Sequence, residues 1–297
     1  MKILVFGGSG QIGFELQRSL CPIANLVVPG FKGVPRVNLA DTGALEKFVI
    51  SAAPDVIVNA AAFTSVDKAE MERDTAHAIN AIAPGVMARA ASAVGAAVIH
   101  YSTDYVFSGD GNKPWSECDK VGPLNYYGES KLAGETAVLS NVERGLIFRT
   151  SWVYSTHGNN FPKTMLRLAP LKENFDVVCD QFGAPTSAPL LADLTAHAAL
   201  RIIGNWSDWG VYHLVAGGET TWSEFAKYLF TRALEYGLID KLPHVSDIAS
   251  LNYKVAAKRP TNSRLDTTKF QTKFHLRIPH WTEGVEHFLR ELSLAKK

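Results

Sequence analysis

Two side chains in the middle of the chain have the spacing that acid–base chemistry needs. Tyr127 and Lys131 are four residues apart, so on a helix a phenol and an ammonium would share one face. A free tyrosine titrates near ~10, and a neighbouring cation favours its phenolate, so Lys131 and a second cation could bring the pKa of Tyr127 toward neutrality. Of the nine tyrosines, only Tyr127 has a lysine four positions on. The pair predicts a proton donor or acceptor, although a half-buried tyrosine beside a solvated lysine has the same spacing.

A dinucleotide-binding turn is predicted at the start of the chain. Residues 2–6 are an apolar run typical of a buried strand, and residues 12–20 carry apolar side chains at helical spacing. Glycines between them let the backbone approach a pyrophosphate, which the free N–H groups and the dipole of the helix would neutralise. A tight turn without a ligand is the alternative. The predicted cofactor contacts begin with Gly7, Gly10 and Gly13.

The second predicted strand, residues 25–28, indicates which nicotinamide cofactor is used. An acidic residue that binds the adenosine ribose of NAD is expected after this strand, but Gly30 and Lys32 stand there, with Arg36 nearby. No carboxylate would then repel a 2′-phosphate, whereas Lys32 could attract one. We therefore expect NADPH, or use of both NADPH and NADH; a solvated Lys32 in a loop is the alternative.

Small and polar residues follow two further predicted strands. The strand 54–59 is followed by three alanines, Ala60, Ala61 and Ala62. Their small side chains would let a flat cofactor lie close to the backbone. Tight packing of a helix on the sheet explains them equally well. After the strand 97–101 come two hydroxyls and a carboxylate: Ser102, Thr103 and Asp104. These groups could hydrogen-bond a substrate carbonyl and its neighbouring hydroxyl. A serine/threonine turn with a helix cap is the alternative.

The alternation of strands and helices up to residue 150 predicts an α/β fold, a Rossmann-like doubly wound parallel sheet. Within it, Asp41 can cap a helix that runs to about residue 51, and apolar residues on one face predict a long helix over residues 76–94. After residue 150 the pattern loosens, with helices predicted near 161–168 and starting at Ser187, Thr221 and about Glu283. We expect residues 1–150 to form a dinucleotide-binding domain, with returning segments at about 172–215. Residues 151–171 and 216–297 would form a smaller, mostly α substrate-binding lobe.

Composition excludes several classes of protein. The 297 residues are 46% hydrophobic and 20% charged, with a formal net charge of +1, so no strong field selects nucleic acid or an anionic membrane. No apolar run approaches the ~18 residues of a membrane helix, and the start of the chain lacks the apolar core of a signal peptide. Three dispersed cysteines favour reduced thiols in a cytoplasm, and the histidines show no zinc-site spacing.

Several longer stretches carry a family resemblance. The glycine turn, Ser102-Thr103 and Tyr127 with Lys131 resemble the extended-type short-chain dehydrogenase/reductases. Within them, the chain is similar to the dTDP-4-dehydrorhamnose reductase family over the stretches 58–62, 99–107, 127–135, 148–154, 180–186 and 259–264. The resemblance implies NAD(P)H-dependent reduction of the C4 ketone of dTDP-4-dehydro-L-rhamnose to dTDP-L-rhamnose, the last step in making that activated sugar.

The same resemblance implies residue roles. Tyr127 would donate a proton to the nascent alkoxide, Lys131 would hold the nicotinamide ribose and lower the pKa of Tyr127, and Thr103 would bind the carbonyl. Asp104 and Trp152 match sugar contacts; Arg259 and Asn262 would lie near the nucleotide half, with a surface ion pair as the alternative. The remaining cofactor contacts, from pyrophosphate to nicotinamide, would be Gly10, Gln11, Ile12, Asn38, Leu39, Ala60, Ala61, Ala62 and Tyr101.

Some members of this family dimerise through a magnesium ion held by carboxylates. Glu15 and Glu291 match two of those positions, but the third is Pro189, whose side chain cannot ligate a metal. We therefore expect no metal, and either a monomer or a homodimer that does not depend on one.

Two other functions remain open from the sequence. A related nucleotide-sugar reductase could deliver the hydride to the opposite face and give dTDP-6-deoxy-L-talose. The regulatory subunit of methionine adenosyltransferase has a similar fold without an established reductase activity. The presence of Ser102, Thr103, Tyr127 and Lys131 argues against this second alternative.

Overall fold

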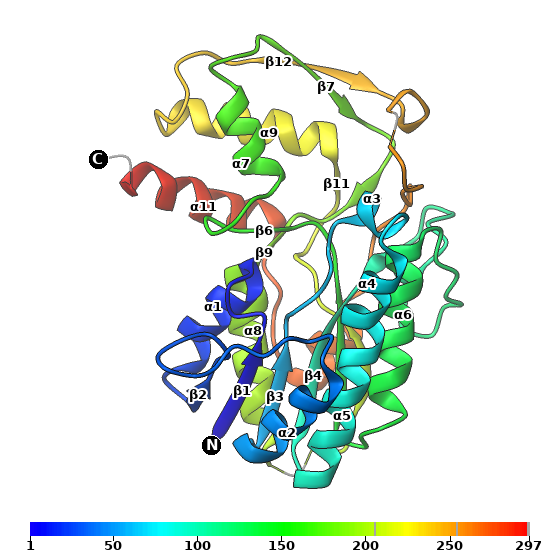
Figure 1. Ribbon diagram of the computed structural model, residues 1–297. Coiled ribbons are helices and arrows are strands. Elements are labelled where there is room, and N and C mark those ends of the chain that lie inside the picture. Colours follow the sequence, from blue (N-terminus) through cyan, green and yellow to red (C-terminus); the bar gives the residue numbers. More distant parts are fainter. Residues whose placement is uncertain (205, 254, 296–297) are drawn as a thin grey trace.

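The computed structural model describes residues 1–204, 206–253 and 255–295. Its centre is a six-stranded, fully parallel sheet in the order β10-β5-β4-β3-β1-β2 (Figure 1). The strands are β1 (Lys2–Phe6), β2 (Asn25–Val27), β3 (Val56–Asn59), β4 (Ala97–Thr103), β5 (Gly145–Thr150) and β10 (Gly210–His213). The predicted parallel α/β sheet is confirmed.

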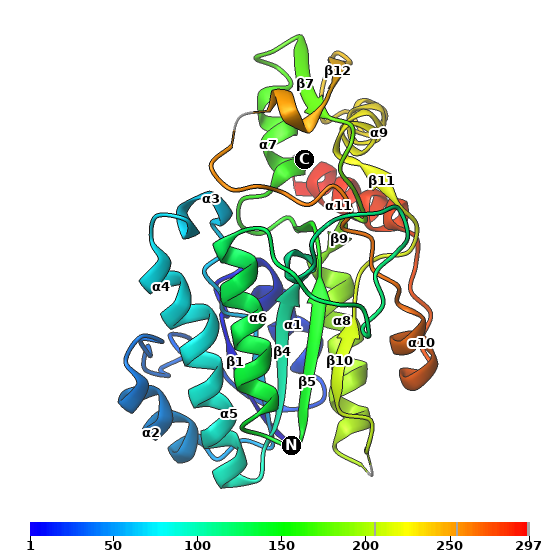
Figure 2. The ribbon, with the colours of Figure 1, turned by 90° about the vertical axis from the view of Figure 1, so that its right-hand side faces the viewer.

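Helices cover both faces of the sheet (Figure 2). On β1, Ile3 and Val5 pack toward α1 and α8, whereas Leu4 and Phe6 pack toward the opposite helices, because successive side chains of a strand alternate in direction. One layer holds α1 (Gln11–Leu20) and α8 (Ala188–Ile202), and the other α2 (Thr42–Ala52), α5 (Ala83–Val94) and α6 (Tyr126–Leu139). The sheet is therefore doubly wound, and its buried strands are apolar on both faces.

Local sequence signals fix where several helices begin. The Asp41 carboxylate accepts from the Ala44 N–H at 2.9 Å at the start of α2, and Ser187 caps α8. At α9 (Trp222–Glu235), Thr221 and Glu224 form a reciprocal capping box. These predicted helix starts are confirmed.

The long helix predicted over residues 76–94 is interrupted. It consists of α4 (Arg73–His77), a π-helical turn (Ala78–Ile82) and α5. Such π turns widen a helix locally and often occur at functional sites. Here the turn contains Asn80, whose side chain reaches two segments of the candidate site described below.

A second group of elements lies above the carboxyl ends of the strands (Figure 1). It contains α7 (Phe161–Leu168), α9 and α11 (Trp281–Ala295), with three two-stranded sheets: β7 (Asn174–Val178) with β12 (His244–Ile248), β8 (Phe182–Gly183) with β11 (Thr220–Thr221), and β6 (Val153–Tyr154) with β9 (Thr186–Ser187). The remaining short helices are α3 (Val66–Ala69), α10 (Thr268–Phe274) and 3-10 turns at Asp104–Val106 and Ser250–Asn252.

The segment 172–215 does not return to the central sheet as a whole. Its strand β10 pairs with β5, as expected for a returning segment. Its strand β7 instead forms a parallel pair with β12 over residues 174–178 and 244–248, because the backbone groups of both strands hydrogen-bond to each other. Of the strands in this segment, β10 joins the central sheet, and the expected domain bounds stay a prediction. In the part of the chain that the structure describes, no helix is long and apolar enough to cross a membrane.

Candidate active site

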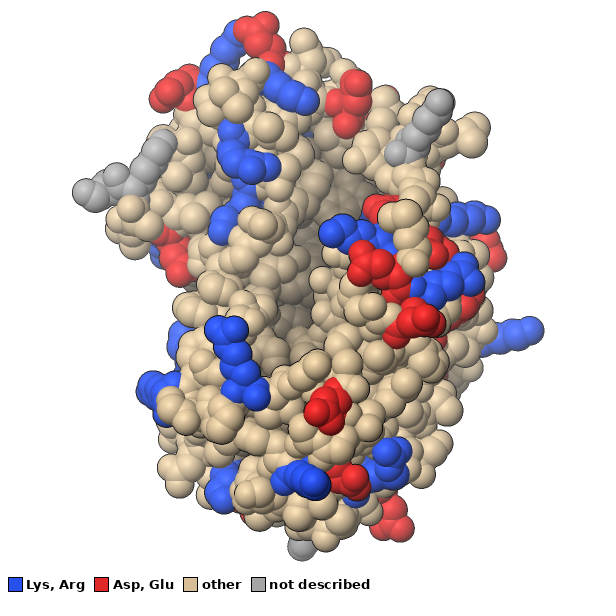
Figure 3. Space-filling model, in the orientation of Figure 1, with Lys and Arg blue, Asp and Glu red and all other residues tan. Residues whose placement is uncertain are grey.

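A cavity of about 820 Å³ lies between the carboxyl ends of the strands and the upper group of elements. In the space-filling view this region is a hollow whose walls carry few charged side chains (Figure 3). Ligands of open α/β sheets bind at this edge of the sheet. The predicted residues that line the cavity are Gly7, Gly10, Gln11, Ile12, Leu39, Ala60, Ala61, Ala62, Tyr101, Thr103, Asp104, Tyr127, Lys131, Trp152 and Arg259.

Four predicted contacts do not line this cavity. Gly13 lies behind the turn, where a Cβ would stand 2.0 Å from the Gly7 carbonyl oxygen. Lys32 and Asn38 are exposed on the loop after β2. The buried Asn262 amide donates to the carbonyl oxygens of Asp110 and Lys113, so its donor group is engaged in holding a neighbouring loop. Ligand contacts by these four residues stay predictions.

The glycine turn brings the start of α1 against the end of β3. Gly7 has φ +82°, and a Cβ on it would lie 2.6 Å from the Ala61 nitrogen and 2.7 Å from the Ala60 carbonyl carbon. Gly10, at the N-terminus of α1, carries no side-chain cap, and no acidic residue stands in the first turn. Backbone N–H groups at this helix start therefore face the cavity without a competing carboxylate, which is the arrangement a pyrophosphate needs.

Tyr127 lies in the first turn of α6. Asn125 caps the helix by accepting from the Gly128 N–H at 2.9 Å, and a Cβ on Gly128 would lie 2.2 Å from the Tyr105 carbonyl oxygen. This close approach places the Tyr127 ring edge-on against the Tyr105 ring, with centroids 5.7 Å apart. Tyr127 lines the cavity beside Thr103 at the end of β4, close enough for the Thr103 side chain to influence the pKa of the phenol. The predicted phenol and hydroxyl are thus brought together.

The protonation of Tyr127 differs from the sequence-based expectation. Burial raises the pKa of its phenol above the usual value, and the Thr103 side chain opposes this only in part. The expected lowering by Lys131 does not appear, because the Lys131 ammonium is directed at the Tyr101 carbonyl oxygen, 2.5 Å away. Tyr127 is therefore protonated at neutral pH, which suits a proton donor.

Lys131 is buried one helical turn beyond Tyr127, with 2% of its surface exposed. Its Nζ also lies 3.4 Å from Nε2 of His100. Burial lowers the pKa of Lys131 to about 8, and the negative charge of Glu135 opposes the shift. An amine that titrates this close to neutrality can both give and take a proton under physiological conditions.

The end of β4 forms the local turn that was the alternative interpretation of its sequence, and substrate contacts by its side chains stay a prediction. The Thr103 hydroxyl donates to the Asp104 carboxylate at 3.0 Å and accepts from the Tyr105 N–H, which is the local turn. Asp104 is 3% exposed, and burial raises its pKa to about 6. Four buried oxygens that belong to cavity-lining residues have no hydrogen-bond partner among the described residues: Ser102 Oγ, Asp104 Oδ2, Thr150 Oγ1 and Ser151 Oγ.

These unpartnered oxygens test whether the site fits a nicotinamide cofactor. Buried polar atoms in proteins almost always have a partner, so four of them along one cavity wall indicate a polar ligand or ordered water. Together with the glycine turn, which lines the same cavity, they fit a molecule that carries both a diphosphate and polar ring substituents. Thr150 and Ser151 were not predicted as site residues, because nothing in their spacing distinguishes them from ordinary strand-end hydroxyls.

An aromatic wall closes another side of the cavity. Trp152 has a left-handed backbone (φ +50°), and its indole stacks on Trp222 with centroids 3.8 Å apart. Gly183 makes room for the ring, since a Cβ there would lie 2.8 Å from Trp152 Cε2. Phe161 packs on the far ring at 4.8 Å. Trp222 was missed from the sequence because it reads as the first residue of a capped helix.

Asn80 is a further residue of the site that was not predicted from the sequence. Its amide accepts from the Phe63 N–H at 2.8 Å, donates to the Phe63 carbonyl at 3.1 Å and donates to Ser130 Oγ at 3.0 Å. Ser130 in turn donates to the Tyr127 carbonyl at 2.8 Å. Asn80 therefore ties the segment after β3 to the helix that carries Tyr127. Only the π turn, which is visible in the structure and not in the pattern, brings it there.

Arg259 lies at the rim of the cavity and is half-buried. It forms an ion pair with Asp67 at 2.8 Å and a long hydrogen bond to the Tyr105 hydroxyl at 3.4 Å. The surface ion pair that was the alternative interpretation is thus present, on a residue that also lines the cavity.

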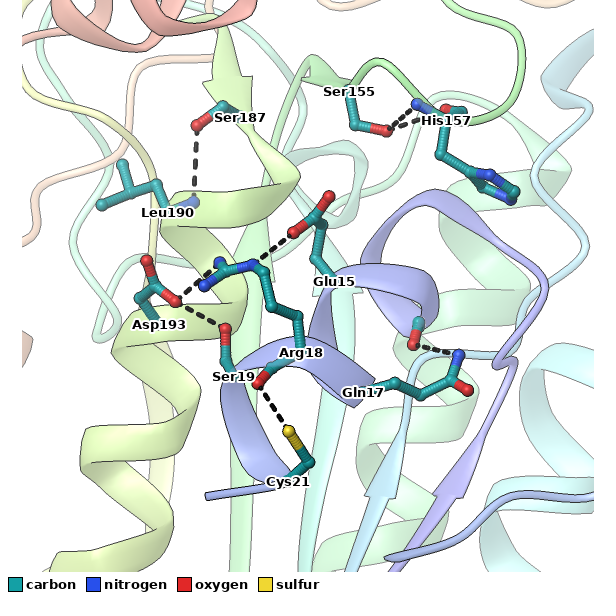
Figure 4. A network of polar contacts seen from close by, with 11 residues as sticks. Glu15, Gln17, Arg18, Ser19, Cys21, Ser155, His157, Ser187, Leu190 and Asp193 are labelled. Atoms are coloured by element: carbon teal, nitrogen blue, oxygen red, sulfur yellow. Dashed lines mark hydrogen bonds and ion pairs between the residues drawn. The ribbon is translucent and has the colours of Figure 1, made fainter. Parts of the chain in front are cut away.

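The carboxylates considered for magnesium lie elsewhere, at a cavity of about 610 Å³ between α1, α8 and α11. Glu15 is ion-paired with Arg18 at 2.9 Å, and Arg18 also binds Asp193 at 2.8 Å (Figure 4). Pro189 lines the same cavity without a ligating atom in its side chain. No group of three or more His, Cys, Asp or Glu side chains within the described ranges could hold a metal. Glu15, Glu291 and Pro189 therefore do not fit the three-carboxylate magnesium site expected for some members of the family.

Comparison with known proteins decides the family. The model of the family described as RmlD substrate binding domain matches residues 1–294. The chain belongs to the RmlD family. A relative in this family, the dTDP-4-dehydrorhamnose reductase of Shigella flexneri, is 50% identical over 294 residues, 98% of each chain. A similar protein of Burkholderia thailandensis with the same name is 42% identical, covering 98% of this chain and 99% of its own.

Solved structures of RmlD relatives share the fold. A dTDP-4-dehydrorhamnose reductase from Bacillus anthracis, crystallised in complex with NADP, has a TM-score of 0.88 and 35% identity, and the match covers 98% of this chain and 99% of that one. A Clostridium acetobutylicum protein of the same name has a TM-score of 0.86 and 34% identity, with coverage of 98% and 99%.

Proposed function

We propose that this RmlD protein is an NADPH-dependent oxidoreductase that reduces the C4 ketone of dTDP-4-dehydro-L-rhamnose to dTDP-L-rhamnose. The observation that carries the proposal is that Thr103, Tyr127 and Lys131 line one cavity together, and that the glycine turn lines the same cavity. The names of the relatives support the same substrate. Neither dTDP-6-deoxy-L-talose formation nor a non-catalytic regulatory role is favoured by these relatives.

The chemistry can be assigned to the side chains in this cavity. When bound, the reduced nicotinamide would supply the hydride. Tyr127, protonated at neutral pH, donates its proton to the oxygen of the reduced carbonyl, while Thr103 holds that oxygen beside the phenol. Lys131 holds the nicotinamide ribose. Because burial raises the pKa of Tyr127, the phenol stays protonated until a nearby positive charge or the developing alkoxide draws the proton away.

The cofactor and substrate would occupy different walls of the cavity. The proposed cofactor contacts that line the cavity are Gly7, Gly10, Gln11, Ile12, Leu39, Ala60, Ala61, Ala62 and Tyr101. Lys32 and Asn38, on the loop after β2, are proposed as further contacts. The proposed sugar contacts are Asp104 and Trp152, and Arg259 would contact the nucleotide half. We place NADPH ahead of NADH because no carboxylate follows β2 to repel a 2′-phosphate.

The organisation of the chain follows from this division. Residues 1–150, with β10 of the later segment, would bind the dinucleotide, and residues 151–171 with 216–297 would bind the sugar nucleotide. We propose a cytoplasmic enzyme, acting as a monomer or a homodimer without a metal, whose only partner in the reaction besides its cofactor is a small dTDP-sugar.

Replacing Tyr127 by phenylalanine tests the assignment of the proton donor. Tyr127→Phe removes only the hydroxyl, so turnover should fall by about 10²- to 10⁴-fold, the usual contribution of a general acid. Binding of NADPH, followed by its fluorescence, should stay near that of the unaltered protein. Tyr126→Phe is the matched control on the adjacent residue, which does not line the cavity. A Tyr127→Phe enzyme that keeps its turnover would remove this residue from the assigned role.

A further inference from the structure

A buried polar chain runs behind Lys131, on the side away from Tyr127. It joins Asn59 at the end of β3, His100 in β4 and Lys131 in α6, which are 2%, 0% and 2% exposed. The Asn59 amide nitrogen lies 3.0 Å from His100 Nδ1, and His100 Nε2 lies 3.4 Å from Lys131 Nζ. None of these contacts between Asn59, His100 and the lysine is used by the reaction as assigned above.

The direction of the hydrogen bonds in this chain is fixed at its far end. The Ala61 N–H can only donate, and it donates to Asn59 Oδ1 at 3.1 Å. The other end of the amide, the NH₂ group, must then face His100 and donate to Nδ1. A ring nitrogen that accepts carries no proton, so the neutral imidazole of His100 has its proton on Nε2. His100 is neutral because burial and the nearby Lys131 charge lower its pKa well below the usual value.

This tautomer has a consequence for Lys131. The Nε2–H of His100 points at Nζ, and a protonated ammonium has no lone pair with which to accept it, whereas a neutral amine has one. Nζ also donates to the Tyr101 carbonyl oxygen, which either protonation state allows. The other charged groups nearby are Glu135, whose carboxylate is bound at both oxygens by Arg149 at 2.8 and 2.6 Å, and Asp104 beyond Tyr127.

We propose that Asn59 and His100 are positioning residues that present an N–H donor to Lys131 and so favour its neutral amine. The inference rests on the proposed reduction and adds that His100 influences the protonation state of Lys131 during it. After Tyr127 has given its proton to the product oxygen, its phenolate has to regain one, and Lys131, one helical turn away, is the buried group that can release a proton for this step. The ammonium then becomes an amine, which His100 stabilises, and the amine is reprotonated from solvent. The direction of the hydrogen-bond chain thus decides how readily Lys131 releases its proton.

The tautomer of His100 can be measured without turnover. In protein labelled with ¹⁵N-histidine, the His100 signals, assigned by their loss in His100→Gln, should report a proton on Nε2 and none on Nδ1, unchanged from about pH 5.5 to 9. A proton on Nδ1 in the unaltered protein would overturn the proposal. Because this measurement needs neither substrate nor cofactor, it stands or falls separately from the proposed reaction.

Asn59→Asp should reverse the direction of the hydrogen bond between residue 59 and His100, with little change in the shape of the side chain. The carboxylate can accept both from the Ala61 N–H and from a proton on Nδ1, so His100 should switch tautomer and turn a lone pair toward Lys131. Lys131 then keeps its proton to higher pH, and the alkaline limb of the kcat profile should move upward by about one pH unit. A switched tautomer with an unmoved limb would refute the link between His100 and Lys131.

Asn141→Asp is the control for added charge. It makes the same substitution just beyond the far end of α6, where the Asn141 side chain bonds only to the Ala137 carbonyl oxygen among the described residues. It should keep the original His100 tautomer and the original pH profile. A shift of the alkaline limb as large as that of Asn59→Asp would assign the effect to charge alone and contradict the proposal.

Discussion

Replacing Trp222 by alanine should weaken binding of the sugar nucleotide while leaving cofactor binding intact. The Trp222 indole stacks 3.8 Å from that of Trp152, whose left-handed backbone is a conformation that costs about 1–3 kcal/mol. The stack contributes about 0.5–1.5 kcal/mol beyond the burial of the rings. Without it, Trp152 can relax away from the cavity wall. A loss of about 1–2 kcal/mol in substrate binding corresponds to a five- to thirtyfold higher KM.

The assay for this prediction is the KM for the dTDP-sugar at saturating NADPH, together with the Kd for NADPH alone. Trp222→Phe should keep most of the affinity, because a smaller ring still stacks. Trp209→Ala removes an indole that packs on Arg144 away from the cavity and should change neither constant. An unchanged KM in Trp222→Ala, or a KM and Kd that rise together, would refute the argument that the two indoles position the sugar.

Three further substitutions test other parts of the molecule. Gly7→Ala should abolish NADPH binding in a fluorescence titration, since φ is +82° and the new Cβ would meet backbone atoms at 2.6 Å. Glu135→Gln should lower the free energy of unfolding by about 3–5 kcal/mol in urea, because it leaves the buried Arg149 charge without its carboxylate. Glu286 binds Arg232 and two tyrosines, which holds its pKa at about 2. A depressed carboxyl pKa stabilises the fold above its unfolded value of about 4.5, so stability should fall as pH drops from 4.5 to 2, and Glu286→Gln should flatten that dependence of Tm.

Control substitutions in the same protein, or a stated contrary result, test each of these three predictions. Gly33 has the same φ of +82° with nothing within 4 Å of a Cβ, so Gly33→Ala separates backbone strain from the clash. Glu173→Gln breaks an exposed ion pair and should change stability by less than about 1 kcal/mol. NADPH binding by Gly7→Ala would contradict the argument from the backbone clash. Equal losses of stability in Glu135→Gln and Glu173→Gln would contradict the argument from the buried ion pair. A Tm that falls between pH 4.5 and 2 in Glu286→Gln as it does in the unaltered protein would contradict the argument from the Glu286 pKa.

Local patterns in the sequence predicted the elements that hold the site. The strand, glycine turn and helix at residues 2–20, and the caps at Asp41, Ser187 and Thr221, are all confirmed, because each depends on neighbours a few residues away. Spacing alone also brought Tyr127 and Lys131 to one helix, and both line the cavity.

The features that the sequence did not predict depend on contacts between distant segments. The strand β7 pairs with β12, about seventy residues later, and no local pattern specifies that partner. The π turn at Asn80 and the stack of Trp152 on Trp222 have the same origin. Burial raises the pKa of Tyr127, and burial is a property of the folded cavity that residue spacing does not show. The lowering of this pKa by Lys131 together with a second cation stays a prediction.

The most direct test of the proposed function is to give the purified protein dTDP-4-dehydro-L-rhamnose with NADPH, and in parallel with NADH. Nicotinamide oxidation is followed at 340 nm and the product is identified by NMR. Oxidation of NADPH with formation of dTDP-L-rhamnose is the predicted result. No oxidation with either cofactor, or dTDP-6-deoxy-L-talose as the product, would contradict the function proposed for this cavity.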